Sequence, residues 1–241
     1  MSKQFEKLKK EVYKANMDLV KYNLVIFTWG NVSGKSDDGK YMAIKPSGVP
    51  YEKLKWQDIV VIDIATGKVV DGKLKPSSDT DTHLEIYRNF KDIKGITHTH
   101  STYATSFAQA GKSIGAYGTT HADCFYGNVL CTRDLTKKEV EDRYELNTGK
   151  VIAETIKKNK INPIHTPAIL VKNHGPFTFG KSAVDSVYNA VTLEEIAKMN
   201  INTLLLNNKP NMKQYVLDKH FYRKHGKNAT YGQAWNDKKY R

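Results

Sequence analysis

The stretch Gly95-Ile96-Thr97-His98-Thr99-His100 constrains this chain more than any other. Ile96 lies in a short apolar run that is typical of a β-strand. Side chains two residues apart leave the same face of a strand, so His98 and His100 are predicted to point the same way. Imidazole nitrogens bind Zn²⁺, and a catalytic zinc site combines three protein ligands with one open position. The pair predicts part of a metal site if a third ligand joins it; the alternative is two histidines beside a sheet edge.

His174 is the candidate third ligand. It follows the apolar run 168–171, a predicted buried strand, and precedes Gly175-Pro176, a pair that we expect to hold the backbone sharply. Taken alone, a histidine in this place is more often a core or loop residue. Together with His98 and His100 it matches an open three-imidazole zinc site whose fourth position takes a substrate oxygen.

The composition indicates a globular protein. A chain of 241 residues, 39% hydrophobic and 26% charged, can bury a sizeable core as one large domain or two small ones. No apolar run approaches the length of a membrane span, and residues 1–6 lack the apolar core of a secretory signal. We therefore expect no membrane association and a cytoplasmic location, where Cys124 and Cys131 stay reduced.

The net charge of +13 raises the question of a nucleic-acid partner. The lysines are spread over the chain, and clusters such as 7–10 and 137–138 are predicted on solvated helix faces. No helix-turn-helix, zinc-finger or RNA-binding aromatic pattern accompanies them, so we expect no nucleic acid. A small acidic substrate such as a sugar phosphate would also benefit from a positive field. The charge alone does not decide between the two.

The order of the predicted elements favours one domain built on a mixed sheet covered by helices. Strands and helices intermix without regular β-α-β alternation, and Ala65-Thr66-Gly67 predicts a hairpin turn. A Thr136 capping box and a Ser182 cap open two of the helices. Strands are expected at 24–27, 41–45, 59–64, 68–70, 96–100, 114–117, 168–171 and 177–179, and helices at 4–22, 82–90, 101–110, 136–158 with a break at 147–149, 182–206 and 212–225.

Two turns, Lys45-Pro46-Ser47-Gly48 and Lys75-Pro76-Ser77-Ser78, share hydroxyls, backbone N–H groups and a nearby lysine. The second also opens a predicted helix, whose N-terminus attracts anions. We interpret them as two halves of a phosphate cup, although either turn alone would be an ordinary polar turn. The chain has neither a Walker loop nor a dinucleotide-binding glycine motif, so a nucleotide is not expected.

Asp79 and Asp123 are candidate acid/base carboxylates. Each also has a structural interpretation, Asp79 as a helix N-cap and Asp123 as a turn former. Tyr231 by itself would be a surface aromatic residue.

Taken in chain order, these motifs resemble the L-ribulose-5-phosphate 4-epimerases of the class II aldolase superfamily. The resemblance runs from about residue 5 to 233. It is carried by Thr28-Trp29-Gly30-Asn31-Val32-Ser33, Lys45-Pro46-Ser47-Gly48-Val49, Lys75-Pro76-Ser77-Ser78-Asp79-Thr80, Gly95-Ile96-Thr97-His98-Thr99-His100-Ser101, Gly118-Thr119-Thr120-His121-Ala122-Asp123, His174-Gly175-Pro176-Phe177 and Asp218-Lys219-His220 through Tyr231-Gly232-Gln233.

This resemblance implies a three-layer α/β/α sandwich with a mixed, mostly antiparallel central sheet. It places one catalytic domain at residues 1–233 and implies a cyclic homotetramer with active sites between subunits. The polar end at 234–241 lies outside the resemblance, and we expect it to be a disordered tail. Asp123 and Tyr231 would form the acid/base pair, with Tyr231 and His220 serving a neighbouring subunit. Zinc would be bound by His98, His100 and His174 with Asp79 at the metal site, and a phosphorylated ketopentose by Asn31, Lys45, Ser47, Gly48, Ser77 and Ser78.

The implied reaction interconverts L-ribulose 5-phosphate and D-xylulose 5-phosphate by breaking and re-forming the C3–C4 bond. The proton on carbon 4 is not acidic enough for direct removal, and inversion places the hydroxyl on opposite sides, so two proton carriers are needed. Arabinose breakdown and ascorbate breakdown both use this activity, and the sequence does not choose between them. It also leaves the native metal open.

Two alternatives remain within the same superfamily. One is a sugar-phosphate aldolase of the fuculose- or rhamnulose-phosphate type; fuculose-phosphate aldolase has a Glu where Asp79 stands, so Asp79 and Asp123 favour the epimerase. The other is a non-catalytic module like the adducin head, which need not keep the zinc histidines that this chain has.

Overall fold

The strands form one sheet in the order β4-β3-β2-β1-β5-β7-β6. The structure is a computed structural model, and it describes residues 3–227 and 229–230. All pairings between these strands are antiparallel, and one isolated parallel bridge joins Cys131 to Leu170. The strands are β1 (Gly30–Lys35), β2 (Tyr41–Ile44), β3 (Val60–Asp63), β4 (Val69–Asp71), β5 (Gly95–Thr99), β6 (Ala168–Val171) and β7 (Gly175–Gly180).

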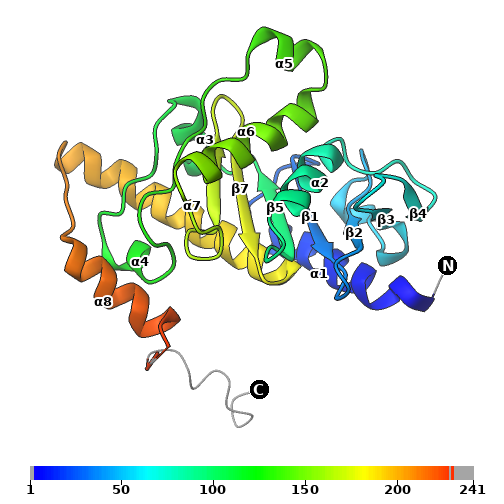
Figure 1. The fold of residues 1–241 in the computed structure, drawn as a ribbon, viewed down its shortest axis with the longest axis horizontal. Coiled ribbons are helices and arrows are strands. Elements are labelled where there is room, and N and C mark those ends of the chain that lie inside the picture. Colours follow the sequence, from blue (N-terminus) through cyan, green and yellow to red (C-terminus); the bar gives the residue numbers. More distant parts are fainter. Residues whose placement is uncertain (1–2, 228, 231–241) are drawn as a thin grey trace.

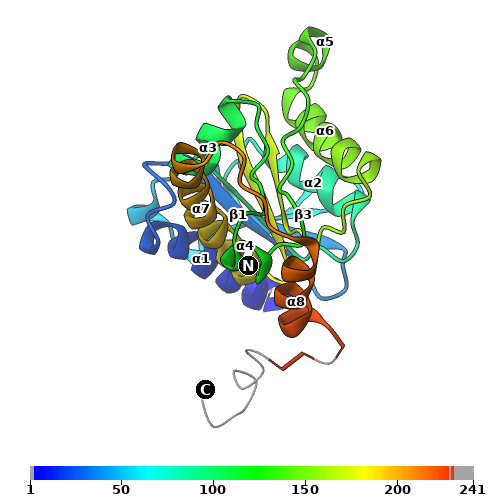
Figure 2. The same ribbon diagram turned by 90° about the vertical axis from the view of Figure 1, so that its left-hand side faces the viewer.

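Helices cover both faces of the sheet (Figure 2). On one side lie α1 (Glu6–Lys21) and α7 (Ala183–Leu206), with α3 (Thr102–Gln109) packed on α7, and on the other side lie α2 (Thr80–Asn89) and α6 (Tyr144–Lys158). The predicted three-layer α/β/α sandwich is therefore confirmed. The remaining short elements are η1 (Lys3–Phe5), η2 (Tyr51–Lys53), η3 (Trp56–Asp58), α4 (Thr119–Ala122), α5 (Lys137–Glu141) and α8 (Gln214–His225).

Strand alternation divides the core between the two faces. Along β3, Val60 and Ile62 pack with the α2 and α6 side chains, whereas Val61 packs with α1 and α7. Such alternation is the period-2 pattern of a strand with both faces covered. Both predicted helix caps are present: the Ser182 side chain accepts a hydrogen bond from the Asp185 backbone, and Thr136 opens α5 with a capping box.

The predicted strand at 24–27 is wrong. The apolar run forms a loop in which Ile26 is 58% and Phe27 77% exposed, and the strand begins only at Gly30. Strand β1 was not predicted because its sequence, Gly-Asn-Val-Ser-Gly-Lys, has little of the apolar pattern by which strands are recognised. Gly34 is small because α1 and α7 approach closely: a Cβ there would lie 2.8 Å from the Val12 side chain. Ser33 faces the other layer, with its hydroxyl 2.7 Å from His83 Nδ1 on α2.

Two further expectations are corrected. The predicted strand at 114–117 is reduced to a single bridge between Ile114 and Val129. The helical break expected at 147–149 lies instead between α5 and α6, at residues 142–143. Gly149 does not break α6 but lets it approach α2, because a Cβ there would lie 2.7 Å from the Glu85 Cβ.

The other predicted elements agree with the structure to within a few residues. Tyr231 and the predicted tail at 234–241 lie outside the described residues. In the described part of the chain, no helix combines the length and the apolar character that crossing a membrane requires.

Candidate metal centre and active site

The strand register brings Asn31, His98, His100 and His174 to the same end of β1, β5 and β7, which are neighbours inside the sheet (Figure 1). Asn31 on β1 pairs directly with His98 on β5, and His98 pairs on its other side with Phe177 on β7. Antiparallel pairing therefore joins the end of β5 to the starts of β1 and β7. His100 follows the last residue of β5, and His174 precedes the first residue of β7.

A tight turn between β6 and β7 presents His174. Val171 pairs with Gly175, so only three residues make the connection. Asn173 takes the left-handed conformation with φ 61°, a region that asparagine tolerates better than most residues. The sharp turn that was expected at Gly175-Pro176 is therefore made by Asn173. Gly175 and Pro176 belong to strand β7.

The three histidines form one cluster with the spacing of a metal site. One nitrogen from each of His98, His100 and His174 lies within 4.8 Å of the others. The Nε2 atoms of His98 and His100 are 3.1 Å apart. Two ligands at roughly 2.0–2.1 Å from a tetrahedral zinc would be about 3.3 Å apart, so this donor set fits the ion with little adjustment.

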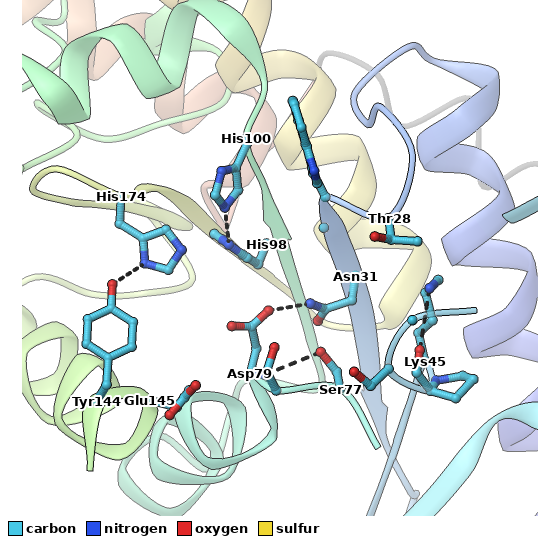
Figure 3. A pocket seen from close by; sticks show the side chains of 16 residues that line it. Thr28, Asn31, Lys45, Ser77, Asp79, His98, His100, Tyr144, Glu145 and His174 are labelled. Atoms are coloured by element: carbon cyan, nitrogen blue, oxygen red, sulfur yellow. Dashed lines mark hydrogen bonds between the residues drawn. The ribbon is translucent and has the colours of Figure 1, made fainter. Parts of the chain in front are cut away.

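On His98 and His174, hydrogen bonds to the outer ring nitrogens leave the inner nitrogens available to bind a cation. The Nδ1 of His98 lies 3.0 Å from the Pro176 carbonyl, which can only accept, so Nδ1 carries the proton and Nε2 keeps its lone pair. The Nδ1 of His174 lies 3.2 Å from the Tyr144 hydroxyl. Figure 3 shows the other ring nitrogen of His174 facing the His98 and His100 rings.

The surroundings of His174 and His100 favour the neutral imidazole. Burial lowers the pKa of His174 to about 3, and the neighbouring His98 and His100 add to the shift. Burial, followed by His98, also lowers the pKa of His100. Neutral imidazole is the form that binds a metal, so the cluster is ready for a cation at neutral pH.

Asp79 faces the same pocket. It holds the N-cap position of α2, but its side chain makes no capping hydrogen bond. Its carboxylate instead accepts a 2.6 Å hydrogen bond from the Asn31 amide. Burial raises the pKa of Asp79, its electrostatic interactions with His98 and His83 lower it, and the net result lies below the usual range. Asp79 lines the pocket with the histidines but does not belong to the three-nitrogen cluster.

The two predicted turns lie side by side. The Ser47 N–H donates to the Lys75 carbonyl at 2.9 Å, and the Ser77 N–H donates to the Lys45 carbonyl at 3.0 Å. Ser47 and Ser77 thereby face a common space, which Gly48 and Ser78 also line. The sequence pattern predicted two halves of one cup, and in the structure the two turns meet.

Lys45 and Asn31 add polar groups to this space. Lys45 is 2% exposed, its ammonium donates to the Val49 carbonyl at 2.6 Å, and burial lowers its pKa to about 8. The Asn31 side-chain oxygen is buried and makes no hydrogen bond with the described residues. Buried polar atoms are rarely left unpaired, so this oxygen is suited to accept a hydrogen bond from a ligand.

All of these groups line one pocket of about 480 Å³, within the range for small-molecule sites (Figure 3). Sequence reasoning missed Tyr144 and Glu145, which enter from the first turn of α6. Trp29 was within a recognised motif but had no role assigned, and it too lines the wall. No spacing rule connects residues 144–145 to the histidines, since only the packing of α6 on α2 brings them there.

Asp123 and His220 do not line this pocket. Asp123 follows α4. Its carboxylate accepts a hydrogen bond of 3.0 Å from His220 Nδ1, and each of its two oxygens lies 3.0 Å from Arg223 Nη2, which donates to both. Figure 1 shows α4 and α8 together at one end of the molecule. Within one chain, the structure therefore groups Asp123 with His220 and not with the three histidines.

Comparisons with known proteins agree with this geometry. The profile described as "Class II Aldolase and Adducin N-terminal domain" matches residues 10–201. A solved L-fuculose 1-phosphate aldolase is 28% identical, with 91% of this chain and 95% of that chain covered and a TM-score of 0.74.

Two more distant structures show the same fold. YgbL from Klebsiella pneumoniae, for which an aldolase, epimerase or decarboxylase activity is suggested, is 24% identical over 91% of this chain and 99% of its own, with a TM-score of 0.69. L-fuculose 1-phosphate aldolase from Glaciozyma antarctica PI12 is 18% identical over 97% of this chain and 87% of its own, with a TM-score of 0.75.

Proposed function

We propose that this chain, which belongs to the class II aldolase and adducin N-terminal domain family, is a metal-dependent enzyme that interconverts L-ribulose 5-phosphate and D-xylulose 5-phosphate. One observation carries the proposal. A single pocket holds three imidazoles at metal-binding spacing and a polar cup of two hydroxyl-bearing turns. Such a pocket can hold a cation and a phosphorylated sugar at the same time.

Zn²⁺ is the proposed metal, with His98, His100 and His174 as ligands and Asp79 beside it. A set of neutral nitrogen donors suits zinc, although related divalent ions also accept imidazole. When bound, the ion supplies Lewis-acid stabilisation of the negative charge that develops on substrate oxygens. The 2.6 Å hydrogen bond from Asn31 holds the Asp79 carboxylate in its place at this centre.

The cup is the proposed phosphate site. The Ser47, Ser77 and Ser78 hydroxyls and the Gly48 turn would donate to phosphate oxygens, and the Lys45 ammonium supplies positive charge. The unpaired Asn31 oxygen would accept a hydrogen bond from a substrate hydroxyl between the cup and the histidines. Substrate binding would thus place the phosphate at one end of the pocket and the reacting carbons at the other.

Inversion at carbon 4 needs two proton carriers, for which we propose Asp123 and Tyr231. Because Asp123 does not line the histidine pocket of its own chain, we propose that a neighbouring subunit of a homotetramer supplies it together with His220. Large exposed apolar side chains support an assembly: Phe27 is 77%, Leu205 81% and Leu206 90% exposed. We also propose that the enzyme acts in the cytoplasm.

A sugar-phosphate aldolase is the second candidate. The 28% identity to an L-fuculose 1-phosphate aldolase over most of both chains favours it. An aldolase would release the aldehyde that an epimerase retains and rejoins. The Asp at position 79, where fuculose-phosphate aldolase has Glu, and the Asp at 123 favour the epimerase.

Product analysis separates the candidates. Purified protein is incubated with L-ribulose 5-phosphate, with and without a chelator. We expect D-xylulose 5-phosphate, formed only with metal and without net aldehyde release. Net glycolaldehyde phosphate and dihydroxyacetone would identify an aldolase, as would metal-dependent cleavage of L-fuculose 1-phosphate alone. Full turnover by metal-depleted protein would refute both, and no turnover of any sugar phosphate would favour a non-catalytic module.

A further inference from the structure

The outer partners of His98 and His174 differ in kind. His98 is oriented by the Pro176 carbonyl, a fixed backbone group inside β7. His174 is oriented by the Tyr144 hydroxyl, a side chain from the other side of the pocket. Outer hydrogen bonds fix the tautomer and direction of a ligating imidazole and raise its basicity. A side chain in that role can be altered without changing a ligand.

We infer that Tyr144 is a positioning residue of the metal centre: its hydroxyl orients His174 and so sets the affinity for the metal. The inference rests on the three-histidine metal site of the proposed function. Through Tyr144, the packing of α6 against α2 controls how well the site holds its ion.

The contact has the geometry that this role requires. The hydroxyl lies 3.2 Å from His174 Nδ1, and the two rings stack with centroids 6.1 Å apart and an interplanar angle of 28°. Figure 3 shows the phenol below His174, on the side away from His98. The stacked ring limits rotation of the imidazole, and the hydroxyl selects which nitrogen faces the cluster.

The tautomer follows from the direction of the ring. If the inner nitrogen of His174 is to bind a cation, it must be unprotonated. Nδ1 then carries the proton and donates a hydrogen bond to the Tyr144 oxygen. Burial raises the pKa of Tyr144, so the phenol stays neutral at physiological pH. A neutral phenol oxygen accepts this hydrogen bond without adding a charge to the site.

The position of Tyr144 depends on two helices. The Thr148 hydroxyl donates to the Tyr144 carbonyl at 2.9 Å and so holds the first turn of α6. The Thr82 hydroxyl, on α2, donates to the Glu145 carbonyl at 2.6 Å. Because α2 also begins next to Asp79, one helix pair positions groups on two sides of the pocket.

The test is the zinc affinity of Tyr144→Phe. The full chain is freed of metal, and zinc binding is measured by competition with a chromophoric chelator, without any substrate. Phe keeps the stacked ring and removes the oxygen, so we expect the dissociation constant to rise about tenfold or more. An unchanged affinity would overturn the inference.

A matched control removes a hydroxyl elsewhere. The Tyr126 hydroxyl donates to Asp218 at 2.8 Å, away from the histidine pocket, so Tyr126→Phe should bind zinc as the unaltered chain does. Thermal unfolding of both metal-free variants shows whether each is folded. Equal losses of zinc affinity in the two variants would indicate a general structural effect and contradict the inference.

A double-mutant cycle shows whether Tyr144 acts through His174. In a His174→Ala background, Tyr144→Phe should cause no further loss of affinity, because the imidazole that it orients is gone. An additional loss there would overturn the inference. A chain that binds zinc tightly but converts no sugar phosphate would refute the proposed reaction and leave this inference standing, whereas an unaltered chain without zinc affinity would refute both.

Discussion

His174 reaches the site because Asn173 adopts a left-handed backbone, and its imidazole is kept neutral by burial. Each of the three imidazoles supplies one nitrogen to the cluster. Losing one ligand from a three-ligand site leaves two, which is too few for a tightly held zinc. The site should therefore be sensitive to any single histidine substitution.

His174→Ala should lose its zinc during dialysis against metal-free buffer. The unaltered protein should retain about one ion per chain under the same conditions. Zinc content is measured by atomic absorption, and activity should fall in parallel. His165→Ala is the control, because His165 makes an edge-to-face contact with Phe221 and does not line the histidine pocket. Retention of zinc by the His174 variant would remove this residue from the ligand set.

Lys45 should make substrate binding sensitive to pH. Burial lowers its pKa to about 8, so its ammonium is charged below that pH and becomes neutral above it. If only the charged form holds the phosphate, KM should rise up to about tenfold between pH 7 and pH 9 while kcat changes less. Steady-state kinetics across this range measure the effect.

Lys45→Met supplies the matched comparison. It removes the titrating group, so its KM should be high at pH 7 and nearly constant to pH 9. A flat KM in the unaltered enzyme would mean either that a bound phosphate keeps Lys45 charged throughout or that Lys45 does not contact phosphate. The KM of the Met variant at pH 7 separates these cases, since only the second leaves it unchanged.

At the scale of elements, the pairing of α2 and α6 builds one wall of the pocket. Gly149 permits it: a Cβ there would lie 2.7 Å from the Glu85 Cβ and 3.0 Å from the Thr82 carbonyl oxygen. Replacing glycine by alanine within a helix normally stabilises it by about 1 kcal/mol. Both contacted atoms are fixed to the backbone of α2, so the overlap costs more, about 1–3 kcal/mol.

Gly149→Ala should therefore lower the Tm and weaken zinc binding, because α6 must move away and carry Tyr144 with it. Calorimetry of the metal-free protein and a zinc titration measure the two effects. Gly118→Ala is the control: no heavy atom lies within 4 Å of its added Cβ, and its φ is −141°, which alanine adopts readily. A Gly149 variant with raised Tm would show that helix propensity outweighs the contact.

Most elements could be predicted because their local patterns agree with their environment. The hairpin at 65–67 and the cap at Ser182 follow rules that act within a few residues. β1 could not be predicted, since its small residues fit elements from elsewhere in the chain: Gly34 packs against α1 and α7, and the Ser33 hydroxyl contacts His83 on α2. The apolar run before it misled the pattern because Ile26 and Phe27 are exposed.

The site residues likewise divide into those that the sequence could predict and those that it could not. The histidine spacing and the two turns were visible in the sequence, because each depends on a short motif. The contact between Tyr144 and His174 joins two residues that are 30 positions apart in the sequence, and no local sequence pattern predicts it. The sequence offers Asp123 as a candidate acid/base residue, but only the three-dimensional structure shows its separation from the histidine pocket.

At the scale of the whole molecule, one chain holds two incomplete sets of groups. The pocket near β5 has the metal ligands and the cup, and the α4–α8 end has Asp123 with His220 and Arg223. A homotetramer in which these two ends of adjacent subunits meet would complete each site. Two inactive variants, each lacking one of the two sets, should then regain activity in a mixed oligomer, which a site built within one chain cannot do.

His174→Ala and Asp123→Asn should each be inactive alone and regain activity when co-expressed and purified together through two different tags. A site then works only where an intact histidine cluster meets an intact Asp123 from its neighbour, so random mixing should restore about a quarter of full activity. Mixing His174→Ala with His100→Ala should restore nothing, because both variants lack the same half. If the first mixture is also inactive although both subunits are present in the purified oligomer, Asp123 does not act across an interface, and each site is built within one chain.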